Sequence, residues 1–138
     1  MENGDDYWEA PVLASFYKLA LTTPPGLNLD PAENEERELR LRQFHHILMA
    51  ACSWRWQLRF LEHLTGHLER YRLVMTPRSK IWSKIVREIE TEHQQLMGFT
   101  IERNTEKASA LLNAHRSRTR SAIKKQFLSD SRTTETCI

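Results

Sequence analysis

Residues that break helices are scarce in this chain. Four glycines and five prolines occur in 138 residues, and Pro24, Pro25 and Gly26 stand together in one linker. Between these breakers, apolar residues recur at intervals of three and four, which is the period of an amphipathic helix. Strands joined by tight turns would need many more turn residues. The sequence therefore predicts an all-α fold, an antiparallel bundle of about five helices.

Periodicity, capping residues and breakers predict where the helices lie. Asp30 is a candidate N-cap with Pro31 at the first helical position, and Asn104 is the candidate N-cap of the last helix. The expected helices cover residues 7–21, 30–51, 54–74, 79–102 and 105–128. We expect residues 1–128 to form one domain and residues 129–138 to form a disordered polar tail.

Composition excludes several classes of protein. No apolar run approaches the roughly 18–20 residues of a membrane-spanning helix, and the mean hydropathy is −0.60. The N-terminus lacks the basic start and apolar stretch of a signal peptide. Two cysteines cannot build a disulfide framework. These features predict a cytoplasmic protein without membrane contact.

Charge is unevenly distributed along the chain. Residues 1–69 carry a net charge of −5, whereas residues 70–138 carry +7. A basic half suggests a nucleic-acid or acidic partner, although two helices with solvated basic faces are the favoured explanation. The last helix holds the densest basic cluster, without the interleaved aromatic residues that single-strand binding uses: Arg116, Arg118, Arg120, Lys124 and Lys125.

Three of the six histidines fall on apolar helical stripes. His45, His93 and His115 each lie on the stripe of a different expected helix. A single histidine on such a face is usually a hydrogen-bonded core residue. Three that converge in a bundle would supply the protein ligands of a three-histidine zinc site, so both interpretations stay open.

The other possible chemical signals are weaker. His63 and His67 are spaced to hold one metal on one helix, but the pair lacks the glutamate that a zinc protease needs as general base. Two solvated or interface histidines are the simpler interpretation. Neither a Gly-rich phosphate loop nor a nucleophile elbow is present in the sequence, and no carboxylate is placed as a base on the three stripes. We therefore expect no enzymatic activity, and a metal hydrolase is the least favoured hypothesis.

Several motifs occur in order along about residues 4–128. They are Phe44-His45 followed by Ile47, Leu48, Ala50 and Ala51, then Glu92-His93-Gln94-Gln95-Leu96, Arg103-Asn104, and Ala108, Leu111, Leu112 and His115. Together they resemble the FCD domain, the all-helical effector-binding domain of the FadR-like subgroup of GntR-family transcription regulators. The opening Gly4-Asp5-Asp6 and the stretch Glu69-Arg70-Tyr71-Arg72 are similar to the carbon-starvation-induced repressor branch.

The resemblance implies a helical bundle with a central pocket. In many members a divalent metal is bound there by one aspartate and three histidines, and a small carboxylate effector occupies its open positions. The three histidines correspond to His45, His93 and His115. The family's aspartate position, one turn before the first histidine, is Leu41, with Glu38 a further turn back as a possible substitute. Loss of this carboxylate predicts zinc or nickel in preference to manganese or magnesium.

The leading hypothesis is a ligand-sensing domain that binds a small organic acid and signals through a homodimer interface to a DNA-binding domain. Arg72, on the third helix, is predicted to bind the effector carboxylate together with Glu38 in the pocket, or else to pair with Glu38. The winged helix-turn-helix and first effector-domain helix of the family are expected to be absent, so DNA would be bound only through another segment. The alternative is a basic helical protein that binds nucleic acid directly.

Overall fold

The computed structural model describes residues 4–22, 30–51, 55–75 and 80–134. These residues form five helices and no strand, which confirms the all-α prediction. None of the described helices is both long and apolar enough to cross a membrane. The helices are α1 (Asp6–Ala20), α2 (Pro31–Met49), α3 (Arg55–Met75), α4 (Lys80–Ile101) and α5 (Thr105–Thr134).

Helix boundaries agree with the sequence prediction except at the end of α5. Asp30 Oδ1 lies 3.5 Å from the amide of Ala32, and Asn104 Oδ1 accepts from the amide of Lys107 at 3.1 Å, so both predicted N-caps are present. The predicted end of the last helix near residue 128 was wrong, because α5 continues to Thr134. Residues 129–134 contain neither proline nor glycine, so nothing local stops the helix.

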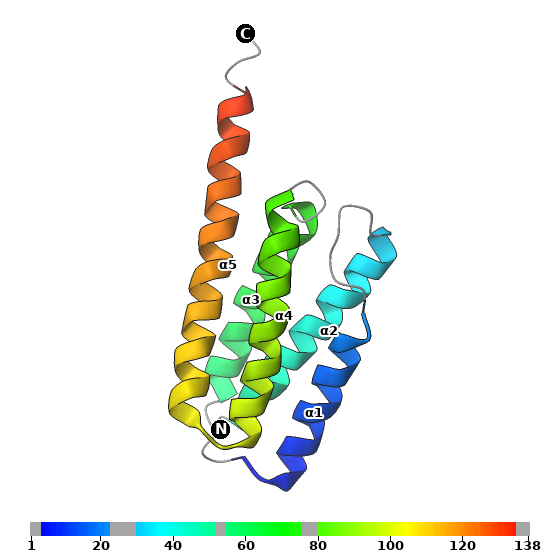
Figure 1. The fold of residues 1–138 in the computed structure, drawn as a ribbon, viewed down its shortest axis with the longest axis vertical. Coiled ribbons are helices and arrows are strands. Elements are labelled where there is room, and N and C mark those ends of the chain that lie inside the picture. The colour runs from blue at the N-terminus through cyan, green and yellow to red at the C-terminus, as the bar shows by residue number, and fades with distance from the viewer. Residues whose placement is uncertain (1–3, 23–29, 52–54, 76–79, 135–138) are drawn as a thin grey trace.

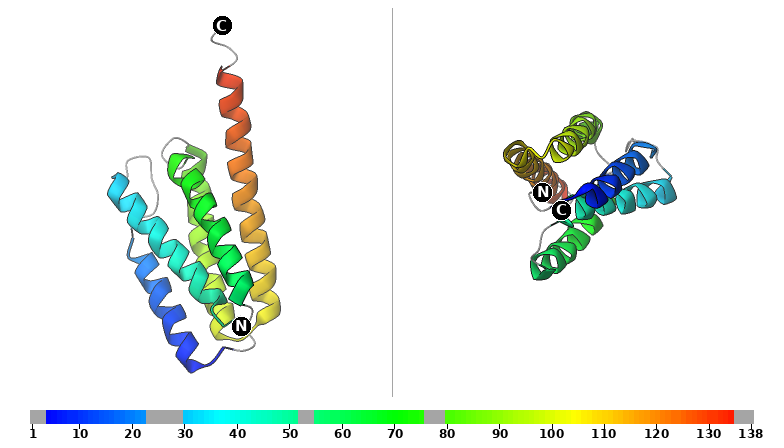
Figure 2. Two further views of the ribbon diagram at one scale, coloured as in Figure 1. Left: turned by 180° about the vertical axis from the view of Figure 1, so that it is seen from behind. Right: turned by 90° about the horizontal axis from the view of Figure 1, so that it is seen from below.

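Successive helices alternate in direction, so that the bundle is antiparallel (Figure 1). α1 packs on α2, and α4 packs on α5, while α3 contacts both α2 and α5. The view along the bundle shows α1 and α2 as one pair and α4 and α5 as another (Figure 2). This arrangement turns the inner faces of α2, α4 and α5 toward one another, which positions the site described below.

The apolar core lies mainly between α1 and α2. Phe44 and Val12 are fully buried at its centre, and Met97 and Ile101 of α4 pack against it. Trp8 adds its ring to this core, and its indole Nε1 donates to the carbonyl of Ile47 at 2.7 Å, so the polar edge of the ring is satisfied. The buried members of the cluster are Trp8, Val12, Leu19, Leu41, Phe44 and Leu48.

The turn between α4 and α5 is tied to the start of α1. Arg103 adopts a positive φ of 56°, which a residue with a side chain rarely does. Its guanidinium donates to Glu9 Oε1 at 2.8 Å through Nε and pairs with it at 2.7 Å through Nη2. Arg103 also donates to the carbonyl of Gly4 and lies 5.8 Å from the centre of the Trp8 ring. These contacts offset the unfavourable backbone conformation at residue 103.

Candidate metal and effector site

Three histidines from three helices converge inside the bundle. His45 extends from α2, His93 from α4 and His115 from α5, and their candidate ligand atoms lie within 4.8 Å of one another. The Nε2 atoms of His45 and His93 are 3.2 Å apart. His93 and His115 are buried, with 2% and 5% of their surface exposed, and His45 is half-buried. The imidazoles predicted from three separate stripes therefore form one cluster.

Aromatic packing orients two of these rings. The Phe44 ring lies 5.9 Å from the His45 ring and 5.7 Å from the His93 ring, measured between centroids. Because Phe44 is fully buried in the core, it restricts the rotation of both imidazoles. The core between α1 and α2 thus supports the histidine cluster from one side.

A buried carboxylate fixes the third ring. His115 Nδ1 donates to Glu92 Oε2 at 2.8 Å, and both side chains are almost completely buried. The other carboxylate oxygen of Glu92 forms an ion pair with Arg118 of α5. A proton held on Nδ1 leaves the Nε2 lone pair of His115 for the cluster. The sequence places Glu92 in the Glu-His motif, but its role beside His115 was not predicted.

The donor set fits a transition-metal ion. Two bonds of about 2.05 Å to nitrogens 3.2 Å apart would meet at about 100°, close to the tetrahedral angle. The hydrogen bond from a histidine's second nitrogen to a carboxylate is the usual outer contact of a metal ligand. Leu41, one turn before His45, is buried in the apolar core, and the cluster found among the described residues contains imidazoles alone.

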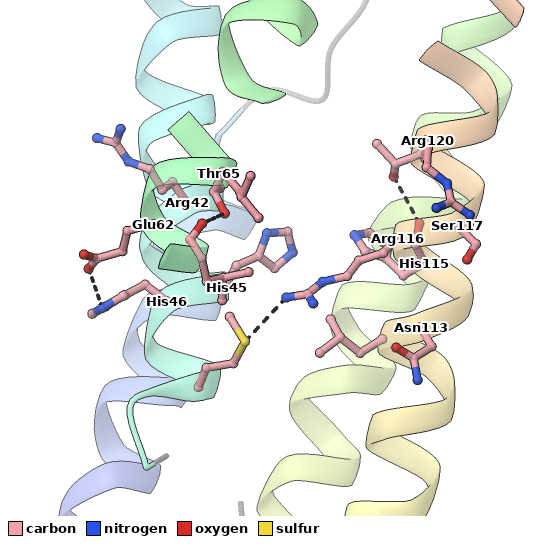
Figure 3. Close-up of a pocket in the computed structure, with 15 residues that line it drawn as sticks. Arg42, His45, His46, Glu62, Thr65, Asn113, His115, Arg116, Ser117 and Arg120 are labelled. Atoms are coloured by element: carbon pink, nitrogen blue, oxygen red, sulfur yellow. Dashed lines mark hydrogen bonds and ion pairs between the residues drawn. The ribbon is translucent and has the colours of Figure 1, made fainter. Parts of the chain in front are cut away.

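A cavity of about 480 Å³ opens beside the cluster, between α2, α3 and α5 (Figure 3). His45 and His115 line one part of it, and leucines of α3 and α5 line another. Three arginines also line it: Arg42 from α2, and Arg116 and Arg120 from α5.

The cavity surface carries more positive than negative groups. Its single glutamate among the described lining residues, Glu62, pairs with His46 at 2.8 Å. Arg116 extends toward α2, where its Nη2 lies 3.5 Å from Met49 Sδ, and enclosure lowers the pKa of this guanidinium without neutralising it. The cavity therefore suits an anionic ligand with a short apolar body.

Neither of the two effector-binding residues predicted from the sequence, Glu38 and Arg72, is found among the described residues that line the cavity. Glu38 is buried on α2, two turns before His45, and is not among the described residues that line the cavity. The side chain of Arg72 lies outside the described part of the structure. The neighbour of Glu38, Arg37, is a buried arginine whose pKa is lowered by burial, an effect opposed by its ion pair with Glu90 at 3.1 Å.

Sequence reasoning missed the arginines of the cavity. Arg116 and Arg120 were assigned only to the basic cluster of the last helix, and Arg42 was not singled out. Their proximity to the histidines was a usable signal, since Arg42 precedes His45 by three residues and Arg116 directly follows His115.

Comparison with known proteins identifies one family and two curated relatives. Residues 27–118 match the FCD domain. The chain is 33% identical over 114 residues to an uncharacterized HTH-type transcriptional regulator, BphR, of Paraburkholderia xenovorans, covering 82% of this chain and 44% of that protein. It is 30% identical over 114 residues to the HTH-type transcriptional repressor GlaR of Escherichia coli, covering 81% of this chain and 50% of the repressor. The chain thus spans about half the length of these curated relatives, and no solved structure gives a significant match.

Proposed function

Because this chain belongs to the FCD domain family, whose relatives include HTH-type transcriptional regulators, we propose that it is the effector-sensing domain of such a regulator. Its effector is a small organic acid that binds in the cavity between α2, α3 and α5. The observation that carries this proposal is a cavity lined by Arg42, Arg116 and Arg120 directly beside the histidine cluster.

Charge complementarity selects the class of ligand. A carboxylate can accept two parallel hydrogen bonds from one guanidinium, a geometry that a hydroxyl or a single carbonyl cannot use. Leu61, Leu64 and Leu112 would contact the carbon chain of the acid. Since the wall is polar at the arginines and apolar at the leucines, the cavity favours short carboxylates over sugars or long acyl chains.

A divalent metal, zinc or nickel, is the proposed cofactor. His45, His93 and His115 would hold it, and Glu92 would keep His115 in the tautomer that presents Nε2. When bound, the ion supplies a Lewis-acidic position for a carboxylate oxygen of the effector. Three imidazole donors without a carboxylate favour these metals over manganese and magnesium.

Signalling would occur through a homodimer and a separate DNA-binding segment. The effector shifts the population between two arrangements of the dimer only if its affinity for them differs. α5 contributes both His115 and Arg116 to the site, whereas His45 comes from α2. A ligand bound between these helices would therefore favour one relative position of α5 and α2.

Elemental analysis of purified protein, followed by calorimetric titration with carboxylates of two to six carbons, tests the proposal. We expect about one zinc or nickel per chain and saturable binding of at least one acid, lost in Arg116→Ala. Arg59→Ala provides the matched control, because Arg59 is an exposed arginine of α3 that does not line the cavity. Absence of binding by the whole panel, with metal present and the fold intact, contradicts the proposal.

Direct nucleic-acid binding is the less favoured function. Of the basic cluster on α5, Arg116 and Arg120 line the cavity, and Arg118 pairs with Glu92 and lies 4.0 Å from Glu88. These three arginines therefore line the cavity or pair with glutamates, and they do not form one phosphate-binding surface. Mobility shifts across a salt series distinguish the two functions, because phosphate binding weakens steeply as salt rises.

A further inference from the structure

A second pair of histidines lies on the opposite side of α3 from the cavity. His63 and His67 are exposed, and four residues of helix bring them to within about 40° of each other around the axis. Leu61 and Thr65, which line the cavity, occupy the other side of the same helix. The pair is therefore separate from the histidine cluster in both position and solvent access.

The two rings meet at their nitrogens rather than stacking. Nε2 of His63 and Nε2 of His67 are 3.2 Å apart, and the ring planes are inclined at 82°. Two metal bonds of about 2.05 Å to nitrogens at this separation would meet at about 100°, an angle between square-planar and tetrahedral geometry. The two nitrogens are thus already close enough for one ion to bind both.

The surroundings leave this pair available. Among the described residues, neither ring is hydrogen-bonded to a carboxylate, in contrast to His46, which pairs with Glu62. A side-chain carbon built at Gly66, between the two histidines, would meet no atom within 4 Å. Because both rings are exposed, an ion can reach the two nitrogens from solvent, and water molecules can complete its coordination.

We propose that His63 and His67 form a surface site for a divalent transition-metal ion, with Cu(II) preferred over Ni(II) and Zn(II). Imidazole nitrogens with water in the remaining positions suit Cu(II), and affinity follows the usual order of divalent ions. On binding, the hydrogen shared between the two Nε2 atoms moves to Nδ1 of its own ring, so that both Nε2 lone pairs face the ion. The ion bridges successive turns of the helix that forms one wall of the cavity.

Retention of the untagged protein on a Cu(II)–iminodiacetate column tests this site. Immobilised copper is tethered to the resin, so it binds exposed nitrogens in preference to the cluster, of which His93 and His115 are buried and His45 is half-buried. We expect the wild-type protein to be retained, and the His63→Ala and His67→Ala variants to elute at no more than a third of its imidazole concentration. Alanine at these exposed positions favours the helix, and circular dichroism confirms that the fold is kept.

Two further variants separate chelation from simple histidine content. His46→Ala removes a histidine that has no histidine one turn away, and it should elute with the wild type. In the His67→Ala background, Arg59→His recreates a pair four residues apart with His63, at an exposed position, and should restore retention. The proposal is overturned if His67→Ala elutes with the wild type, or if the Arg59→His change restores nothing.

Discussion

Replacing Leu41 by aspartate should improve the metal site while weakening the fold. Leu41 lies one turn before His45 on α2, where an added carboxylate would provide a fourth, anionic ligand. The same side chain is buried in the apolar core, with 7% of its surface exposed. Leu41→Asp therefore loses apolar packing in the core but gains a ligand for the metal. The net change in the free energy of unfolding depends on whether metal is bound.

The cost without metal follows from burial. Removing a buried leucine side chain loses about 2 kcal/mol of apolar transfer free energy, and placing a polar group there without a partner adds about 1–3 kcal/mol. A total near 4 kcal/mol, at about 3 °C per kcal/mol for a domain of this size, lowers the melting temperature by about 12 °C. Zinc at a hundred times its dissociation constant raises the free energy of unfolding by about 2.7 kcal/mol.

Melting temperatures with and without zinc, measured by circular dichroism, test this balance. We expect zinc to raise the melting temperature of Leu41→Asp by more than that of the wild type, and competition with a chromophoric chelator to show tighter binding. Leu41→Asn is the matched control, because it loses the same packing without adding an anionic ligand. If zinc raises the melting temperature of the aspartate and asparagine variants equally, position 41 does not reach the metal and the reasoning is refuted.

Three other changes probe the remaining contacts. Glu92→Gln should weaken zinc binding by about 10-fold to 100-fold in chelator competition, because His115 loses its charged acceptor, and unchanged affinity would contradict this role. Arg120→Ala should weaken carboxylate binding in calorimetry and leave the melting temperature within a few degrees, because Arg120 is an exposed cavity residue; equal affinity would exclude it from the effector site. Arg103→Gly should unfold at higher denaturant than Arg103→Ala, by roughly 1 kcal/mol, because φ is positive there; the reverse order would count against the backbone argument.

Local signals explain why the helices were predictable. Asp30 and Asn104 cap the helices that follow them through their own side chains, so their effect can be predicted without tertiary information. The end of α5 was missed because the polar composition of the residues after Leu128 was interpreted as disorder. These residues contain no helix breaker. Helix continuation there is a property of the uninterrupted backbone rather than of composition.

The site was predictable only in part. His45, His93 and His115 share the inner faces of their helices with apolar residues, so periodicity alone singled them out. Periodicity did not identify the cavity arginines, because Arg116 is turned toward α2 only through the packing of α5 against α3 and α4. Rotation of one helix against another is a tertiary property that a stripe of residues does not determine.

The length of α5 has a mechanical consequence. The helix spans Thr105–Thr134 and extends beyond the ends of the other helices (Figure 1). From His115 to Thr134 its axis rises about 28 Å at 1.5 Å per residue. A tilt of about 5° at His115 would displace Thr134 by about 2.5 Å. A small tilt near the buried imidazoles would therefore be amplified to a displacement of a few ångströms at the far end of the helix.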